Sequence, residues 1–303
     1  MGQVPELTYS EIKSWKQCRF KHHLSYVERL TSREPKSFFR LGNAVHMFID
    51  MMYHEVGKTI DFKTLMGRVD EWSDTLKKEP NQFESEDEAK IELATIKGML
   101  TAYHDHYFVN EKFEGIVTEQ EISVEFEGYL LRAKVDAIVL LGDKYWTMEH
   151  KTASSFSDAD RRLLFIDEQT THYCMIAQLR YKKVFEGGIR NILKKPTIKQ
   201  TKKETVDEYC IRLVEDYRSR PEHYLQRIIV DRTQGEIAVH QNLLRGIIGE
   251  MLSGQSIFKS PAMMTCGMCE FFDFCTERNE EVRKGILDSK FRQKGSKHTE
   301  LTK

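Results

Sequence analysis

The chain has 303 residues, of which 40% are hydrophobic, so it can bury a sizeable core as one large domain or two small ones. Its formal net charge of −1 argues neither for nor against nucleic acid. No apolar run approaches the roughly 18–20 residues of a membrane span, and the first residues lack the apolar core of a secretory leader. We therefore expect a cytoplasmic protein, where clustered cysteines indicate a metal more often than a disulfide.

Helical patterns come first along the chain. The segment TYSEIKSWKQCRFKHHLSYVERL is typical of a helix, with Thr8 or Ser10 as N-cap and Glu11 placed for a capping box with Thr8. The segment FFRLGNAVHMFIDMMYHEV carries apolar residues at helical spacing, and a third helix is predicted over roughly Glu88 to Phe108.

The hydrophobic period then changes to two. The segment IVTEQEISVEFEGYLLRAKVDAIVLLGDKYWTMEHKTAS predicts a meander of three strands, with turns near Glu127-Gly128 and Gly142-Asp143. Helices are predicted to resume around Asp158–Phe185, and then near Glu204–Arg218 and Glu236–Ser253. Helices, then strands, then helices predict a mixed α/β domain with a small central sheet.

Two strands of this meander carry the residues with the clearest chemistry. Asp136 lies inside the apolar strand AKVDAIVL, and Glu149 and Lys151 follow in YWTMEHKTAS. Residues i and i+2 of a strand share a face, so Glu149 and Lys151 point the same way, and a neighbouring strand can bring Asp136 beside them. Two carboxylates and an ammonium predict a site for a hard cation, although structural salt bridges at a sheet edge are the alternative.

Two helical motifs and one basic segment are weaker signals. Gly42 and His46 lie one turn apart in GNAVH, and Gln169 and Tyr173 share a helix face in DEQTTHY. Alone, each is typical of ordinary packed or surface residues. The segment from Arg180 to Lys203 has nine basic residues and one acid, which indicates either a phosphate-binding surface or a solvated helix face and loop.

A cysteine cluster, TCGMCEFFDFCTER, lies near the end of the chain. It places Cys266, Cys269 and Cys275 within ten residues. A tetrahedral or iron–sulfur site held by cysteine normally has four ligands, so one ligand is missing from this segment. The polar, basic residues 281–303 that follow are predicted to form a mobile tail.

These motifs occur in a specific order: Cys18, G-x-x-x-H, a strand with Asp, a strand with Glu-x-Lys, a helix with Gln-x-x-x-Tyr, and C-x-x-C-x5-C. This order resembles the RecB-like branch of the PD-(D/E)XK nuclease superfamily, from about Leu7 to Arg278. Within that branch it resembles iron–sulfur exonucleases, such as AddB-type nuclease domains and CRISPR-adaptation exonucleases. The segment EGGIRNILKKPTIKQTKKET also resembles nuclease proteins of phage genomes.

The resemblance implies a restriction-endonuclease-like core over residues 1–280, a small mixed sheet flanked by helices. It makes Cys18 the fourth ligand, so that a four-iron four-sulfur (4Fe-4S) cluster would join the two ends of the chain. Because His22 follows Cys18 by four residues, a Cys3His zinc site is an alternative that the spacing does not separate. The remaining thiols, Cys174 and Cys210, fit buried or incidental residues.

The resemblance also implies roles at the acidic site. His46, Asp136, Glu149 and the main-chain carbonyl of His150 would bind one or two Mg or Mn ions, and Lys151 would orient the attacking water. Further residues would position the lysine or the substrate backbone (Gln169 and Tyr173) and contact phosphates (Lys194, Lys195 and Lys199).

The implied function is divalent-metal-dependent DNA exonuclease activity on single-stranded DNA or DNA ends, in phage or bacterial recombination, replication or processing. No G-x-x-x-x-G-K-[ST] signature is present, so a helicase partner would be a separate protein; a recombinase and a single-strand-binding protein are other candidate partners. The alternatives are a non-catalytic DNA-binding or complex-stabilising member of the same fold, and a zinc-stapled interaction module.

Overall fold

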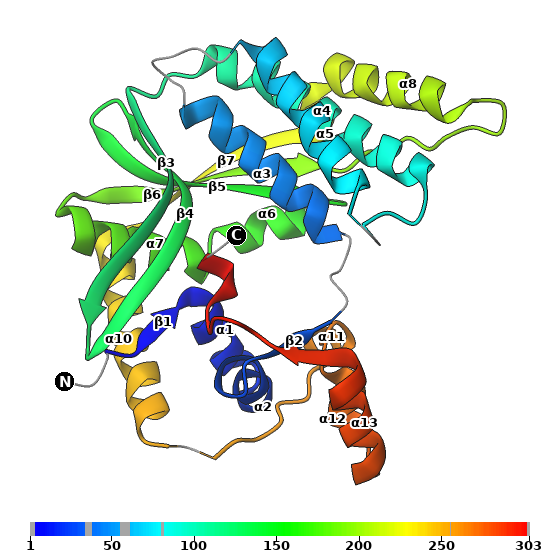
Figure 1. Cartoon of the computed structure of the whole chain (residues 1–303). Helices are drawn as coiled ribbons and strands as arrows, with labels where there is room; N and C mark the ends of the chain where they lie inside the picture. The colour runs from blue at the N-terminus through cyan, green and yellow to red at the C-terminus, as the bar shows by residue number, and fades with distance from the viewer. Residues whose placement is uncertain (1–3, 34–37, 55–60, 80–81, 255, 302–303) are drawn as a thin grey trace. The chain divides into compact units, whose positions relative to one another are not determined.

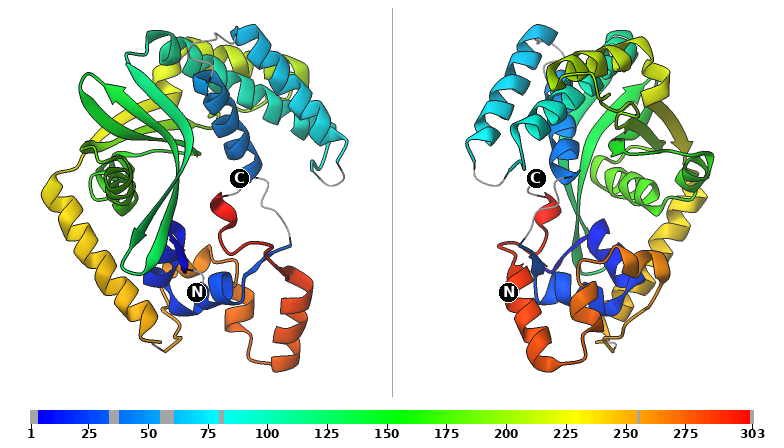
Figure 2. Two further views of the ribbon diagram at one scale, coloured as in Figure 1. Left: turned by 60° about the vertical axis from the view of Figure 1, so that its left-hand side comes forward. Right: turned by 90° about the vertical axis from the view of Figure 1, so that its right-hand side faces the viewer.

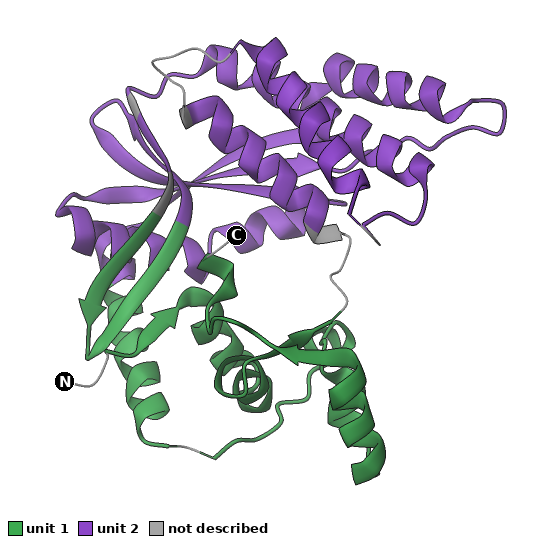
Figure 3. Ribbon diagram, in the orientation of Figure 1, with its two compact units in different colours: residues 1–36, 121–134, 238–303 green, residues 37–120, 135–237 purple. Residues whose placement is uncertain are grey.

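The computed structural model describes residues 4–33, 38–54, 61–79, 82–254 and 256–301. The chain forms two units, which Figure 3 shows in different colours. Unit 1 comprises residues 1–36, 121–134 and 238–303, and unit 2 comprises residues 37–120 and 135–237. The residues predicted as one domain, 1–280, thus contribute to both units.

Three consecutive strands confirm the predicted meander (Figure 1). They are β3 (Gly115–Phe126), β4 (Tyr129–Leu141) and β5 (Lys144–Ala153), and β5 is antiparallel to β4. The two turns fall where they were predicted. Gly128 and Gly142 have φ angles of +80° and +63°, a left-handed conformation that glycine adopts without the steric cost of a Cβ.

The sheet has further strands that the sequence analysis did not predict. β6 (Phe185–Lys194) runs parallel to β5, and β7 (Leu225–Asp231) is antiparallel to β6. A short strand, β1 (Glu6–Thr8), pairs in parallel with the start of β4, giving the order β1-β4-β5-β6-β7 with β3 beside β4. The sheet is therefore mixed, as predicted. β6 is buried along most of its length. A strand that is covered on both faces lacks alternating polarity, so the sequence pattern does not identify it as a strand.

The helices of unit 2 are α3 (Phe38–His54), α4 (Phe62–Lys77), α5 (Glu86–His106), α6 (Asp158–Leu164), α7 (Glu168–Tyr181), α8 (Val206–Ser219) and α9 (Pro221–Tyr224), with a 3₁₀ turn, η2 (Phe108–Asn110). Met148 of β5 belongs to the apolar core shared with α3, α5 and α8, whereas its neighbour Thr147 contacts Cys174 of α7. Successive strand residues point to opposite faces, so α7 covers one face of the sheet and α3, α5 and α8 cover the other (Figure 2).

Unit 1 contains α1 (Tyr9–Gln17), α2 (Arg19–His22), most of α10 (Gln234–Leu252), α11 (Met263–Gly267), α12 (Phe272–Thr276) and α13 (Glu280–Lys290), with a π-helical turn, η1 (His23–Val27), and a 3₁₀ turn, η3 (Thr299–Leu301). The predicted N-terminal helix is therefore divided at Cys18, which caps both α1 and α2. A small apolar cluster of Leu24, Phe271 and Phe291 packs η1 against the C-terminal part of this unit.

The C-terminal segment differs from the mobile tail predicted over residues 281–303. Most of its first part is α13, which Asn279 caps by accepting hydrogen bonds from two main-chain N–H groups. A strand, β8 (Phe291–Gln293), then pairs antiparallel with β2 (Leu30–Ser32). The side chains of Phe291 and His298 are buried. Only a few residues of the segment make these long-range contacts, and most of the others are polar. Its composition therefore predicts a mobile tail although part of it is packed.

Glu11 connects the N-terminal helix to this C-terminal segment. The Thr8 side chain caps α1 as predicted, by accepting from the Glu11 main-chain N–H at 3.3 Å. The Glu11 carboxylate does not complete a capping box, because it lies 3.0 Å from His22 Nε2, 2.6 Å from His298 Nε2 and 2.9 Å from Lys297 Nζ. Burial opposes ionisation of Glu11, but these three partners outweigh it and lower the pKa of its carboxyl to about 2.

No helix among the described residues is long and apolar enough to cross a membrane.

Candidate active site

Two carboxylates lie beside each other on neighbouring strands of unit 2. In the antiparallel pairing of β4 and β5, Ala137 lies opposite Met148, so the preceding Asp136 comes near Glu149, and the two carboxyl groups interact electrostatically. Asp136 Oδ2 accepts a 2.7 Å hydrogen bond from the main-chain N–H of His150. Lys151 is exposed and follows Glu149 by two residues, so it lies on the same face of the strand. The structure therefore brings the two acidic residues together and places the lysine on the same strand face as Glu149.

The surroundings act differently on the two carboxyl groups. Burial opposes ionisation of Asp136, but the neighbouring His46 and His150 outweigh it and lower the pKa of Asp136 to about 2. At Glu149, burial and the negative charge of Asp136 raise the pKa well above its ordinary value, against the opposing charge of Arg190. Repulsion between two adjacent carboxylates is relieved when a cation binds both.

The chemistry of the candidate metal ligands, two carboxylates, fits a hard divalent cation. Glu149 Oε1 is buried and has no hydrogen-bond partner among the residues that the structure describes. A carboxylate oxygen of this kind, beside a second carboxylate, is the ligand type that Mg or Mn binds. In the part of the chain that the structure describes, however, no three His, Cys, Asp or Glu side chains are arranged closely enough to hold a metal. The site has the ligand types but not the coordination geometry.

His46 reaches this site from α3. Its Nδ1 lies 3.4 Å from Asp136 Oδ2, and its ring meets that of His150 edge-on, with the centroids 5.9 Å apart. One turn earlier, a Cβ added at Gly42 would lie 2.9 Å from Thr152 Oγ1 of β5. The glycine of GNAVH therefore lets α3 approach the strand closely enough for His46 to reach the carboxylate.

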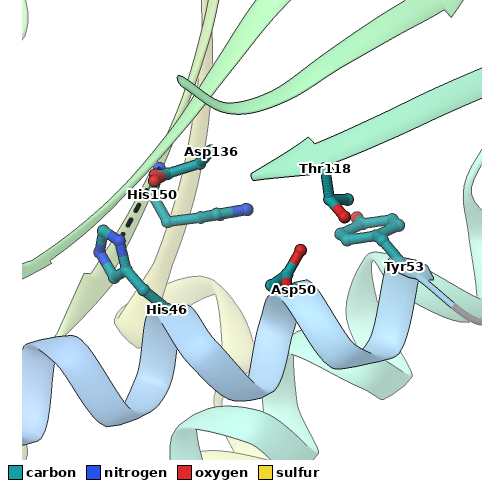
Figure 4. A pocket seen from close by; sticks show the side chains of 6 residues that line it. All are labelled: His46, Asp50, Tyr53, Thr118, Asp136 and His150. Atoms are coloured by element: carbon teal, nitrogen blue, oxygen red, sulfur yellow. Dashed lines mark hydrogen bonds and ion pairs between the residues drawn. The ribbon is translucent and has the colours of Figure 1, made fainter. Parts of the chain in front are cut away.

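A small pocket beside α3 contains residues that the sequence analysis did not single out. Its lining consists of His46, Asp50, Tyr53, Thr118, Asp136 and His150 (Figure 4). Asp50 and Tyr53 follow His46 by four and seven residues, so helical spacing from the histidine was the signal that could have identified them.

His150 is fixed in this pocket as a neutral side chain. Burial lowers the pKa of its imidazole to about 3. Its Nδ1 lies 3.2 Å from Asn191 Nδ2 of β6, and that amide also donates to Tyr103 OH at 3.2 Å. These contacts hold the strand on which the proposed carbonyl ligand lies.

The Gln-x-x-x-Tyr pair lies on α7, as predicted. Gln169 Nε2 donates a 2.9 Å hydrogen bond to Tyr173 OH. Burial, followed by the negative charge of Glu149, raises the pKa of Tyr173. The hydroxyl is therefore protonated at neutral pH, and it interacts electrostatically with Glu149.

Lys194, Lys195 and Lys199, the lysine triplet, follow the same part of the sheet. Lys194 ends β6, and the main-chain N–H of Lys195 donates to the carbonyl of Ala153 at the end of β5. Lys194 and Lys195 are half-buried and Lys199 is exposed. The triplet thus extends from the strand ends nearest Lys151 into the connection to α8.

The four cysteines of the predicted cluster all belong to unit 1 and are free thiols of intermediate exposure. Cys18 Sγ accepts from Lys21 N at 3.5 Å, and Cys266 Sγ accepts from Ala262 N at 3.4 Å. Among the described residues, no cysteine cluster close enough to bind a metal is formed. The segments are nevertheless neighbours, since Phe20 of α2 stacks on Phe274 of α12.

The remaining thiols and His22 have other surroundings. Cys174 is buried on α7 and Cys210 lies on α8, both in unit 2. His22 Nε2 is bound to the Glu11 carboxylate, so this nitrogen is not available to complete a Cys3His zinc site.

Comparison with known proteins identifies the family. Residues 6–276 match the model of the PD-(D/E)XK nuclease superfamily, and the chain therefore belongs to it. No curated protein matches the chain. The crystal structure of a protein named "putative exonuclease" from Eubacterium rectale aligns with a TM-score of 0.56 and 11% identity over 94% of each chain, which supports the same fold. The protein SSO0001 aligns with a TM-score of 0.32 and 14% identity, over 80% of this chain and 98% of its own.

Proposed function

We propose that this member of the nuclease superfamily is a divalent-metal-dependent DNA exonuclease of the RecB-like branch. The observation that carries the proposal is the pair of neighbouring carboxylates, Asp136 and Glu149; one Glu149 oxygen is buried and finds no partner in the described part of the chain. Its substrate would be single-stranded DNA or DNA ends, in phage or bacterial recombination, replication or processing. A separate helicase, recombinase or single-strand-binding protein would supply any further activity.

The metal ligands would be His46, Asp136, Glu149 and the main-chain carbonyl of His150. Bound Mg or Mn would lower the pKa of a water molecule and stabilise charge on the scissile phosphate. The chain's own contribution begins with burial, which removes competing solvent from Glu149. The contact of 3.4 Å between His46 Nδ1 and Asp136 keeps that carboxylate ionised and directed toward α3.

Lys151 would place its ammonium group where negative charge increases in the transition state. Gln169 and Tyr173 are hydrogen-bonded to each other and would position this lysine or the substrate backbone. The lysine triplet would contact DNA phosphates, and such contacts are independent of sequence. An exonuclease requires this property because it must pass along any DNA.

We also propose that Cys18, Cys266, Cys269 and Cys275 bind a 4Fe-4S cluster. The support is their shared unit, their free thiols and the two main-chain N–H groups that donate to sulfur, since such hydrogen bonds accompany cluster ligands. The engagement of His22 by Glu11 favours cysteine as the fourth ligand over histidine. The cluster would be structural, because it would join the first helices to the segment after α10.

The decisive experiment incubates end-labelled single- and double-stranded DNA with the wild type, Glu149→Gln and Glu125→Gln, with and without Mg or Mn. Glu125 is an exposed residue of β3, so its variant controls for the same chemical change elsewhere. Release of terminal nucleotides by the wild type and Glu125→Gln, but not by Glu149→Gln, is the expected result. If the wild type binds DNA and cuts nothing with either metal, the protein is a non-catalytic DNA-binding member of the fold.

A further inference from the structure

Arg190 is a buried cation beside the proposed active site. By sequence it belongs to the basic segment between Arg180 and Lys203, for which phosphate binding or a solvated face was expected. In the structure its side chain is only 7% exposed, because it lies on β6, where it pairs in register with Glu149 of β5. A buried guanidinium needs several hydrogen-bond and ion-pair partners to offset its lost hydration. The partners of Arg190 therefore show which parts of the site it connects.

The guanidinium group connects two elements of the site. Its Nη1 lies 3.7 Å from Glu149 Oε2. On its other side, Nη2 donates to Thr170 Oγ1 at 2.9 Å and forms an ion pair with Asp167. Asp167 is the N-cap of α7, whose main-chain N–H groups at Gln169 and Thr170 donate to its carboxylate.

The packing between β6 and α7 is close at this point. A Cβ added at Gly188, two residues before Arg190, would lie 2.6 Å from Thr170 Cγ2. The glycine therefore permits the first turn of α7 to approach β6, where the arginine can bond it. Because Gln169 lies in that turn, its position relative to Glu149 depends on the same contact.

We propose that Arg190 is a positioning residue that holds the Glu149 carboxylate and the N-terminus of α7 in one fixed arrangement. A guanidinium is planar and presents five donors, so it can face Glu149, Asp167 and Thr170 at once, whereas a lysine ammonium is a single point of charge. This inference rests on the proposed nuclease function, because Glu149 is there a metal ligand. Partners that orient a metal ligand typically change metal affinity or activity by about 10–100-fold when they are lost.

Arg232 provides a matched control. It is also buried, and it bonds the same part of the chain: Thr171 Oγ1 at 2.7 Å and the carbonyl oxygens of Leu164 and Asp167 at 3.1 and 3.0 Å. In the described part of the chain, none of the hydrogen bonds of its guanidinium group goes to Glu149. Replacing either arginine by lysine therefore removes buried hydrogen bonds near α7, but only the change at Arg190 removes the contacts with Glu149 and the N-cap carboxylate of Asp167.

The experiment measures the Mn affinity and the thermal midpoint of the metal-free protein, the affinity by calorimetry, and then kcat and KM for DNA with Mn present. Arg190→Lys should weaken Mn binding about 10-fold and lower kcat by about 10–100-fold, while KM for DNA changes less than about twofold. Arg232→Lys should lower the thermal midpoint to a similar extent but leave Mn affinity and kcat within about twofold of the wild type. If both variants change every quantity equally, or Arg190→Lys binds Mn and cuts DNA like the wild type, Arg190 is only a structural residue.

Two further results complete the test. If Arg190→Lys does not fold, Thr170→Val removes one of the three partners of Arg190 with a smaller loss of stability. The kcat of this variant should fall by about three- to tenfold with KM unchanged. A wild-type kcat in that variant overturns the inference. If the wild type itself neither binds Mn nor cuts DNA, the proposed function fails and the inference fails with it, whereas an active wild type confines any failure to Arg190.

Discussion

Replacing Glu11 by glutamine tests the connection between the two ends of the chain within unit 1. The side chain of Glu11 is 2% exposed and faces His22, His298 and Lys297. Its pKa is lowered from 4.5 to about 2, which corresponds to about 3 kcal/mol of stability at neutral pH. Glutamine keeps the shape but removes the charge, and it leaves Lys297 without this ion-pair partner. We expect the free energy of unfolding of unit 1 to fall by about 3 kcal/mol at pH 7.

The sign of the pH dependence follows from the lowered pKa. The folded state binds fewer protons at Glu11 than the unfolded state, so this contribution is present in full above pH 4.5 and is lost as the pH falls toward 2. At pH 3 about 2 kcal/mol of it should already be lost, and the difference between the wild type and Glu11→Gln should shrink by that amount.

The assay is urea unfolding at pH 7 and pH 3, with trypsin cleavage in the C-terminal segment as a readout specific to unit 1. Cleavage after Lys294 and Lys297 should accelerate in Glu11→Gln because the segment detaches more often. Glu125→Gln, the same change at an exposed position of unit 1, should alter stability by less than about 0.5 kcal/mol. The reasoning is refuted if the two variants unfold at the same urea concentration, or if their difference is the same at both pH values.

Three further outcomes are expected. Metal-free Glu149→Gln should be at least as stable as the wild type in urea, because burial and the charge of Asp136 disfavour the ionised form of Glu149. Its Mg- or Mn-dependent cleavage of DNA should nevertheless fall by orders of magnitude. Cleavage equal to that of the wild type would mean that other residues carry the chemistry. Replacing the lysine triplet by alanine should weaken DNA binding and reduce the slope of log affinity against log salt by up to about three units, and an unchanged slope would mean that the triplet makes no phosphate contacts. Anaerobically purified wild type should be brown with about four irons per chain, which Cys18→Ala should lose and Cys174→Ala should keep; colourless protein with one zinc per chain would contradict the iron–sulfur proposal.

The sequence determined those parts of the fold that depend on local patterns. The meander was predictable because alternating polarity marks strands with one exposed face, and because glycine marks the turns at Gly128 and Gly142. The cap at Thr8 and the long helices α5, α8 and α10 were predictable for the same reason, since caps and helical periodicity depend only on neighbouring residues. In the site, the order of motifs indicated Asp136, Glu149, Lys151 and His46.

Only the tertiary structure decided which distant residues meet. β6 is covered on both faces and therefore lacks a distinctive period, so Arg190 could not be recognised from the sequence as a buried partner of Glu149. The contact between Glu11 and His298 closes a separation of 287 residues, and no local pattern encodes such a pairing. Hydrophobic periodicity identifies which side of an element is buried, but it does not identify the partner. The choice of partner depends on the packing of the whole chain, which is why Glu11 bonds His298 rather than completing the capping box at Thr8.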